Sequence, residues 1–229
     1  MFIKYVTDMF LFCFQSSRFF YFGSITLIFF TMLAFGDFPA RSSGTTQPAK
    51  KLMIFGDSLT AGYGVEEKNS FSKKLSGALK RKGINVTIIL SSVSGDTTAG
   101  GSARIDWALA DKPDAVLLEL GANDGLRGID PKISRKNLEF ILKKLAKHRV
   151  RTLLAGMLAP PNLGKEYTKE FNNIYSSLAE KYNILFYPFF LEGVATKPQL
   201  NQTDGIHPNP KGVDEIVKRI LPLVIKLVK

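Results

Sequence analysis

Two short polar motifs, far apart in the chain, contain the residue types that nucleophilic catalysis requires. Ser58 lies in Gly-Asp-Ser-Leu directly after an apolar run, and His207, one of only two histidines, lies three residues after Asp204. A serine hydroxyl is a weak nucleophile at neutral pH unless an imidazole accepts its proton and a third group orients that imidazole. We therefore expect Ser58 as nucleophile, His207 as base and Asp204 as the orienting acid, which predicts a serine hydrolase.

The tetrahedral intermediate of such a reaction also needs hydrogen-bond donors aimed at its oxyanion. Gly95, in Ser-Gly-Asp-Thr, follows the second predicted strand, and Asn123, in Gly-Ala-Asn-Asp, follows the third. Glycine at position 95 would permit close backbone approach to a ligand. The expected oxyanion hole therefore consists of the backbone N–H groups of Ser58 and Gly95 and the side-chain amide of Asn123.

Each of these motifs is a weak signal when taken alone. Gly-Asp-Ser and Gly-Ala-Asn-Asp form turns or helix caps in many chains, and Asp204 with His207 would also fit a helix-capping loop with a surface histidine. Because all four motifs lie in order at predicted strand ends or before the final helix, we favour the catalytic interpretation. Asp57 and Asp124 are expected to hydrogen-bond the loops, and His148 to be a solvated cation at a helix C-terminus.

From residue 51 onward, short apolar runs alternate with segments of helical hydrophobic periodicity. Strands are expected at residues 51–55, 86–90, 115–120, 150–155 and 184–186, and the β-branched second strand is expected to be buried. Helices are expected between residues 70 and 83, at 103–110, around 138–145 and 171–178, and from Asn209-Pro210 onward. This alternation predicts an α/β fold, a three-layer α/β/α sandwich with a five-stranded parallel sheet. Ligand sites in such sheets lie beyond the carboxyl ends of the strands, where these motifs fall.

Taken together and in this order, the four motifs resemble those of the GDSL or SGNH hydrolase family, named for its Ser, Gly, Asn and His. The matching positions are Ser58, Gly95, Asn123 and His207, with Asp204 as the acidic partner. The resemblance covers nearly all of the chain from residue 52 to 228. It implies the flavodoxin-like SGNH hydrolase fold, a Ser-His-Asp triad that forms an acyl-enzyme, and no cofactor.

The resemblance is closest to the bacterial branch of multifunctional thioesterase I, lysophospholipase and arylesterase. Three segments carry it, namely residues 121–128, the Tyr-Pro-Phe-Phe at 187–190, and Asp-Gly-Ile-His-Pro-Asn at 204–209. Ala122 stands where that branch often has glycine. Because alanine is also small, this departure is expected to have little effect on the geometry of the loop.

The substrate is expected to be a small-molecule acyl ester or thioester. Leu126, Leu158 and Pro160 follow strand ends and are expected to line an acyl groove, which would suit fatty acyl or aryl groups. We therefore expect an arylesterase, acyl-CoA thioesterase or lysophospholipase. A carbohydrate O-acetylesterase of the cell envelope would use the same chemistry and remains the alternative. A non-catalytic exported binding protein and a basic lipid- or nucleic-acid-binding module are also open.

Composition limits the possible partners. The formal net charge of +11 could serve attraction to anionic membranes or nucleic acid, but the lysines and arginines are spread over separate predicted helices. Because no nucleic-acid-binding motif accompanies them, we expect solvated helix faces and no nucleic-acid partner. We expect the protein to be a monomer. The sole cysteine, Cys13, precedes the predicted domain, which therefore contains no disulfide or cysteine-based metal site. No metal is expected at Asp204 and His207 either, because further ligands are absent nearby.

The N-terminus reads as a targeting segment. Residues 19–35 are almost wholly apolar, and Ala34 and Gly36 at the end of this run are small residues at the spacing that a signal peptidase prefers. The run is long for a signal peptide and close to the length of a membrane span. We predict a signal peptide or N-terminal membrane anchor at residues 1–36, a linker at 37–50 and an SGNH hydrolase domain at 51–229. The protein is therefore expected to be exported, periplasmic or secreted, or anchored to the inner membrane by this segment.

Overall fold

The computed structural model describes residues 49–229, so the predicted signal peptide or anchor and nearly all of the predicted linker lie outside the described residues. Five strands form one sheet in the order β2-β1-β3-β4-β5, and every neighbouring pair is parallel. The strands are β1 (Lys50–Gly56), β2 (Val86–Ser92), β3 (Ala115–Glu119), β4 (Arg151–Ala155) and β5 (Leu185–Tyr187). This parallel five-stranded sheet confirms the prediction.

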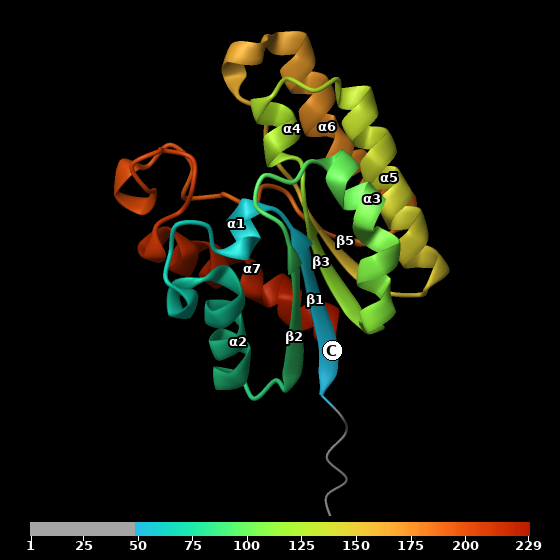
Figure 1. The fold of residues 1–229 in the computed structure, drawn as a ribbon, viewed down its shortest axis with the longest axis vertical. Coiled ribbons are helices and arrows are strands. Elements are labelled where there is room, and N and C mark those ends of the chain that lie inside the picture. The colour runs from blue at the N-terminus through green and yellow to red at the C-terminus, as the bar shows by residue number, and fades with distance from the viewer. Residues whose placement is uncertain (1–48) are drawn as a thin grey trace, which may run out of the picture. The chain divides into compact units, whose positions relative to one another are not determined.

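Helices cover both faces of the sheet and give the predicted three layers (Figure 1). Helices α2 and α7 pack together on one face, and α3, α5 and α6 pack together on the other. The helices are α1 (Ser58–Ala61), α2 (Phe71–Arg81), α3 (Thr98–Ala108), α4 (Ala122–Leu126), α5 (Pro131–Lys147), α6 (Lys165–Tyr182) and α7 (Pro210–Val228). Short 3₁₀ helices lie at Glu67–Asn69, Leu109–Asp111, Pro161–Leu163 and Pro198–Leu200. Within residues 49–229, we find no helix with the length and apolar content that a bilayer span requires.

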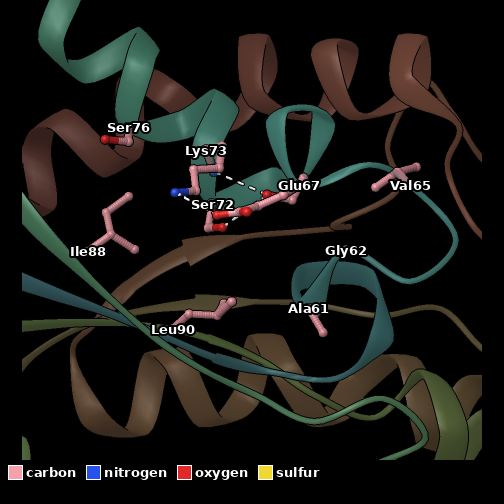
Figure 2. Close-up of a pocket in the computed structure, with 10 residues that line it drawn as sticks. Ala61, Gly62, Val65, Glu67, Ser72, Lys73, Ser76, Ile88 and Leu90 are labelled. Atoms are coloured by element: carbon pink, nitrogen blue, oxygen red, sulfur yellow. Dashed lines mark hydrogen bonds and ion pairs between the residues drawn. The ribbon is translucent and has the colours of Figure 1, made fainter.

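The second strand differs from its prediction. Residues 86–90 were expected to be buried, but β2 is an edge strand, and Leu90 is 48% exposed. Ile88 and Leu90 line a surface cavity between β2 and helix α2 (Figure 2). A run of β-branched residues indicates a strand but does not distinguish an edge from the centre of a sheet, so the expectation of burial was wrong.

Helix α3 begins earlier than the sequence suggested. The expected start was residue 103, whereas the helix starts at Thr98, and the Thr97 side chain accepts a hydrogen bond from the N–H of Gly100. Gly100 and Gly101 lower the helix propensity of this first turn. Gly101 packs against the core, where an added Cβ would lie 2.3 Å from a methyl group of Leu120. Close packing against the sheet therefore explains the glycine.

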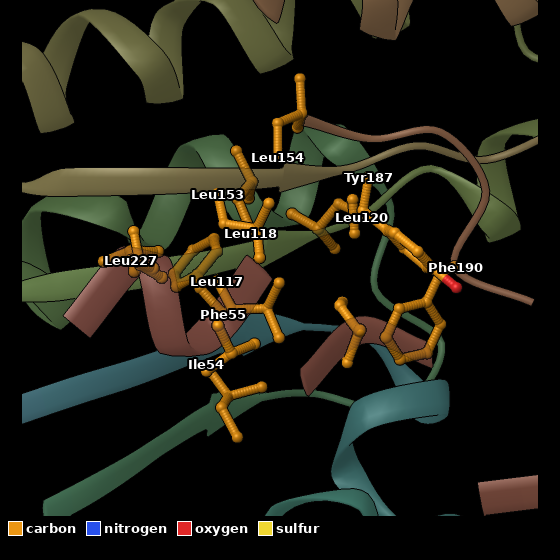
Figure 3. Packing of buried hydrophobic residues seen from close by; sticks show 14 of the residues in the cluster. Ile54, Phe55, Leu117, Leu118, Leu120, Leu153, Leu154, Tyr187, Phe190 and Leu227 are labelled. Carbon is orange, nitrogen blue, oxygen red and sulfur yellow. The ribbon is translucent and has the colours of Figure 1, made fainter. Parts of the chain in front are cut away.

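The hydrophobic core lies on both faces of the central strands (Figure 3). Leu117 and Leu118 are adjacent in β3 and point to opposite faces, and both are fully buried. Burial of each large apolar side chain stabilises the fold by about 1.5–3 kcal/mol. Phe190, which follows β5, is also fully buried and packs edge-on against Phe71 of α2 at 5.2 Å between ring centroids. This contact packs the segment after β5 against helix α2.

The start of the last helix is as predicted. The Asn209 side chain caps α7 by accepting hydrogen bonds from the N–H groups of Lys211 and Gly212, and Pro210 occupies the first turn. Asparagine is a preferred N-cap residue, and proline suits a first turn because its missing N–H is not needed there. The cap fixes where the helix begins and therefore where the preceding loop, with Asp204 and His207, must lie.

Candidate active site

Ser58 lies at a tight turn between β1 and α1. The side chain of Asp57 caps α1 by accepting a hydrogen bond from the N–H of Leu59 at 3.0 Å. At Gly56 an added Cβ would lie 2.3 Å from Thr60 Oγ1 and 2.7 Å from the backbone oxygen of Glu119. Only glycine fits this close approach, so the strand can turn sharply into the helix and carry Ser58 to the carboxyl end of the sheet.

The loop before α7 folds His207 onto Ser58. His207 Nε2 lies 2.9 Å from Ser58 Oγ, and His207 Nδ1 lies 2.8 Å from Asp204 Oδ2. The other oxygen of Asp204 accepts hydrogen bonds from the N–H groups of Ile206 and His207, both at 3.0 Å. The structure thus brings together the three residues that were predicted as nucleophile, base and acid.

The charge state of Asp204 suits this arrangement. Burial acts to raise the pKa of Asp204, but the hydrogen bonds from the N–H groups of His207 and Ile206 and from the His207 ring outweigh it, and the pKa lies below its ordinary value. The carboxylate therefore accepts a hydrogen bond from His207 Nδ1–H, which leaves Nε2 as the acceptor that faces the Ser58 hydroxyl. This is the tautomer that proton removal from Ser58 requires.

Two further side chains support the imidazole. The ring of Tyr63 lies 4.6 Å from the ring of His207, centroid to centroid. Gln202 ties the two segments together, because its side-chain amide donates to the backbone oxygen of Tyr63 at 2.8 Å and its N–H donates to that of His207 at 2.8 Å. Neither residue was identified from the sequence, in which an exposed tyrosine and a glutamine carry no distinctive pattern.

Asn123 reaches the same site from helix α4. Its side-chain amide donates to the backbone oxygen of Asp96 at 2.9 Å and, at a longer 3.4 Å, to Asp57 Oδ2. Gly95 lies in the turn after β2 with a φ of +83°, and Arg127 donates to its backbone oxygen at 3.1 Å. Ser58 and Asn123 both line one cavity, whereas Gly95 is not among the described residues that line it.

The cavity that contains Ser58, Asn123 and His207 has a volume of about 410 Å³. Leu126, Leu158 and Pro160, the predicted substrate-binding residues, all line it. Leu126 is 49% exposed and Leu158 is 45% exposed, so both present apolar surface at the mouth. The other lining residues are Leu59, Ala122, Met157, Ala159, Pro161, Phe189, Leu191, Ala195, Thr196, Asn201, Gly205 and Ile206.

Part of this wall was not foreseen. Phe189, Leu191 and Ala195 come from the segment after β5, where residues 187–190 resemble a family signature but carry no indication of a pocket. Ile206, which is 44% exposed, contributes from the catalytic loop itself. In the sequence, a single isoleucine between Asp204 and His207 carries no signal of a pocket, because isolated apolar residues are common on protein surfaces.

A buried carboxyl was also missed. Glu119, the last residue of β3, is fully buried beside Asp57, and its Oε2 lies 3.4 Å from the Asp57 N–H nitrogen. Burial raises the pKa of Glu119 well above its ordinary value, and the neighbouring Asp57 adds to the effect. In the sequence Glu119 reads as a polar interruption near the end of an apolar strand, which is a signal that could have been noted.

The remaining acidic and histidine predictions can be located. Asp57 caps α1, and Asp124 accepts hydrogen bonds from Thr98 N at 2.9 Å and Thr98 Oγ1 at 2.5 Å, so both bind loops as expected. His148 is exposed at the C-terminal cap of α5. In residues 49–229, no three His, Cys, Asp or Glu side chains gather as metal ligands would.

This fold, with a serine, a histidine and an aspartate joined by hydrogen bonds at the carboxyl end of its sheet, is that of a serine hydrolase. The chain belongs to the GDSL-like lipase/acylhydrolase family, whose model matches residues 54–214. An arylesterase of Vibrio mimicus is 40% identical over 185 residues, which cover 80% of this chain and 92% of that protein. The thioesterase 1/protease 1/lysophospholipase L1 of Escherichia coli K12 is 38% identical, over 77% of this chain and 86% of that protein.

Solved structures agree with this membership. The crystal structure of TesA is 35% identical, with a TM-score of 0.74, and the match covers 78% of this chain and 99% of that one. The SGNH-hydrolase esterase AlinE4 is 46% identical, with a TM-score of 0.68, over 81% of this chain and 100% of that one. The predicted SGNH hydrolase fold is therefore confirmed, and the chain is a GDSL-type hydrolase.

Proposed function

We propose that this enzyme hydrolyses carboxylic esters and thioesters of fatty acyl or aryl groups, with Ser58 as nucleophile, His207 as general base and Asp204 as the acid that orients it. One observation carries the proposal. Ser58 Oγ, 2.9 Å from His207 Nε2, opens into a cavity of about 410 Å³ with largely apolar walls. A nucleophile with its base in hydrogen-bonding contact and room for an acyl chain is what acyl transfer needs.

The reaction proceeds in two halves. Ser58 Oγ attacks the acyl carbonyl carbon while His207 Nε2 takes the hydroxyl proton, and Asp204 stabilises the imidazolium that forms. The tetrahedral intermediate collapses when His207 returns the proton to the leaving alcohol or thiol, which leaves an acyl-enzyme on Ser58. A water molecule then repeats the attack with the same proton transfers, which releases the carboxylic acid and restores the serine.

The oxyanion hole would combine the N–H of Ser58, the amide of Asn123 and the N–H of Gly95. Asn123 now donates at 2.9 Å to Asp96 and at 3.4 Å to Asp57, and the longer bond is the weaker one. A developing oxyanion would compete for the proton of this longer bond. Each such donor is worth about 3–4 kcal/mol of transition-state stabilisation.

The lining favours apolar acyl groups over sugar acetates. Apart from Ser58, Asn123 and His207, the described lining residues with polar side chains are Thr196 and Asn201. A glycan would need more hydrogen-bond partners than two side chains supply, because buried polar groups without partners cost free energy. A fatty acyl or aryl group gains from the same walls. The names of the relatives, an arylesterase and a thioesterase/lysophospholipase, fit this chemistry.

A side-by-side substrate series tests the proposal. The purified protein should be assayed on p-nitrophenyl esters of increasing chain length, acyl-CoA, lysophospholipid and acetylated sugar. We expect kcat/KM to rise with chain length from acetyl to a medium acyl group. The Ser58→Ala variant should hydrolyse none of the substrates that the wild type hydrolyses. Preference for acetylated sugar would support the O-acetylesterase instead, and no turnover of any ester would support a binding protein.

We further propose that residues 1–36 export the protein, as a cleaved signal peptide or a retained anchor. The support is the apolar run at residues 19–35 and the small residues Ala34 and Gly36 at its end. Mass spectrometry of the N-terminus after expression in a Gram-negative host separates the two forms. A periplasmic protein that starts near residue 37 indicates cleavage, and a membrane-bound full-length protein indicates an anchor. Accumulation of the full-length protein in the cytoplasm would contradict export.

A further inference from the structure

A pair of carboxyl groups lies buried beneath the nucleophile turn. Glu119, at the end of β3, and Asp57, at the end of β1, are both fully buried. Glu119 Oε2 lies 3.4 Å from the N–H nitrogen of Asp57 and 3.3 Å from Thr60 Oγ1. Glu119 Oε1 has no hydrogen-bond partner in the described part of the chain. The mechanism above uses neither carboxyl, so their presence in the core requires an explanation.

Two adjacent buried carboxyls cannot both be ionised, because each charge is poorly solvated and repels the other. Asp57 has the better set of donors for a negative charge, since Leu59 N–H donates to Oδ1 at 3.0 Å and Asn123 donates to Oδ2 at 3.4 Å. Glu119 has an oxygen with no partner among the described residues, which is tolerated far better in a neutral acid than in a carboxylate. The proton of the pair therefore belongs on Glu119.

The surrounding groups support this assignment. Burial raises the pKa of Asp57 to about 6, the hydrogen bond from the Leu59 N–H and the charge of His207 oppose the rise, and the charge of Asp96 adds to it. From α3, Arg104 is committed to Asp96 Oδ2 at 2.7 Å. From α6, the Tyr175 hydroxyl donates to the backbone oxygen of Leu120 at 3.0 Å. The pKa of Glu119 is raised further than that of Asp57, by burial and by Asp57 itself.

We propose that Glu119 is a positioning residue, whose carboxyl stays protonated during turnover and whose Oε2 accepts hydrogen bonds from the Asp57 N–H and the Thr60 hydroxyl. The inference rests on the hydrolytic role of Ser58 and Asn123 proposed above. Asp57 connects these two groups, because one of its oxygens caps the helix that begins with Ser58 and the other accepts from Asn123. A fixed Asp57 therefore holds the nucleophile turn and the oxyanion donor in one mutual geometry.

The consequence concerns kcat rather than substrate affinity. If the acceptor at position 119 is lost, the Asp57 N–H and the Thr60 hydroxyl lose this hydrogen-bond partner, and Asp57 holds the α1 turn and Asn123 less firmly. Small displacements of catalytic groups lower the rate steeply, whereas the apolar cavity that binds the acyl group is unchanged. Glutamine at position 119 keeps a neutral oxygen acceptor in a side chain of the same shape and should preserve the geometry.

Infrared spectroscopy of the full-length protein tests the proton directly, without dependence on turnover. At about pH 7.5 the wild type should show the C=O stretch of a protonated carboxylic acid, and the difference spectrum against Glu119→Gln should show that this band has been lost. Absence of the band in the wild type, or its persistence in Glu119→Gln, would overturn the proposal. Because the band is read without substrate, its failure is distinguishable from a failure of the proposed hydrolysis.

Kinetics of matched variants test the positioning role. We expect Glu119→Gln to keep kcat within about threefold of the wild type and Glu119→Ala to lower it on the order of 10- to 100-fold with KM unchanged. Leu117→Ala is the control, because Leu117 is fully buried on the same strand and, two residues away, on the same face. It should lose stability but keep kcat. A kcat of Glu119→Gln as low as that of Glu119→Ala, or a normal kcat in Glu119→Ala, would refute the role.

Discussion

Two surface cavities lie at the two ends of the short helix α1, and the larger of the two is not the candidate active site. The cavity beside the edge strand β2 has a volume of about 590 Å³, whereas the cavity at Ser58 has about 410 Å³. The larger one is lined by Ala61 and Gly62 at the end of α1 and by residues of α2 and β2 (Figure 2). A choice between these two cavities by volume alone would have missed the candidate active site.

The polar groups of the two cavities explain why only the smaller one is the candidate active site. The larger cavity also contains serines, but Ser70 Oγ caps α2 by accepting from Lys73 N at 3.4 Å and lies 3.2 Å from Ser72 Oγ. Its charged groups, Lys73 and Glu67, form an exposed ion pair at 2.8 Å, and no histidine is among the described lining residues. The hydroxyls there serve helix structure, whereas the Ser58 hydroxyl faces an imidazole. Function follows the convergence of polar groups within an apolar pocket.

The largest expected effect comes from removing the nucleophile. Ser58→Ala should lower kcat on p-nitrophenyl esters by roughly 10⁴- to 10⁶-fold, because no other group can form the acyl-enzyme. His207→Ala should cause a loss of similar size, since the two residues act as a unit. The matched control is Ser76→Ala in the larger cavity, which should behave as the wild type. Substantial turnover by Ser58→Ala, with circular dichroism showing an intact fold, would remove the basis of the comparison.

The second prediction concerns the oxyanion donor. Asn123→Ala should reduce kcat by about 10²- to 10³-fold, because one hydrogen bond to the transition state is lost, with only a small change in KM. Steady-state kinetics on a single ester separate the two constants. If KM rose instead and kcat were unchanged, Asn123 would be a substrate-binding residue and not an oxyanion donor.

The third prediction is a pH dependence of stability. The pKa of Glu119 is raised by burial, so the folded state keeps a proton that the unfolded chain releases above about pH 4.5. Stability from this proton is full below that pH and is lost as the pH rises. Glu119→Gln cannot ionise, so its free energy of unfolding relative to the wild type should improve by about 1.4 kcal/mol per pH unit between roughly pH 5 and 7.

Urea unfolding at several pH values provides the measurement for this third prediction. The control lies in the larger cavity, where the hydrogen bond and charge of Lys73 lower the pKa of the exposed Glu67. Its carboxylate is ionised in both the folded and the unfolded chain over this range, so Glu67→Gln should show no such trend. A flat difference between Glu119→Gln and the wild type would mean that Glu119 is ionised in the folded protein.

The smallest expected effect concerns the apolar residues that line the cavity at Ser58. Leu126→Ala should lower kcat/KM for a medium-chain ester by about 5- to 10-fold, because part of the buried apolar contact is lost, and should leave the acetyl ester nearly unaffected. Leu90→Ala removes a comparably exposed leucine from the larger cavity, where Leu90 is 48% exposed, and should change neither substrate. Equal effects of both substitutions would show that the acyl group does not lie where we place it.

The alternation of strands and helices and the start of α7 were predictable because each has a local cause, and the meeting of Ser58 with Asp204 and His207 was predictable because the fold is a parallel sheet. Parallel strands bring their carboxyl ends to one edge, and Asn209-Pro210 marks a helix start whatever the tertiary context. The catalytic roles of these residues remain predictions, as does the signal peptide or membrane anchor at residues 1–36. What the sequence could not supply were features that depend on distant neighbours.

Three misses illustrate this dependence. The edge position of β2 is decided by which strands pair with it, and its own residues carry no trace of that choice. Glu119 gains its character from burial beside Asp57, 62 positions away along the chain. Phe189 lines the cavity at Ser58 because the segment after β5 folds back toward helix α1 and the catalytic loop. Long-range packing determined all three, and local propensity cannot encode it.

Covalent labelling tests the central claim most directly. The protein should be incubated with a fluorophosphonate, which reacts only with an activated serine, and the modified peptide should be identified by mass spectrometry. We predict one label per chain, on Ser58, and none in the Ser58→Ala or His207→Ala variants. Label on Ser70, Ser72 or Ser76 beside the larger cavity, or no label on the active protein, would contradict the account.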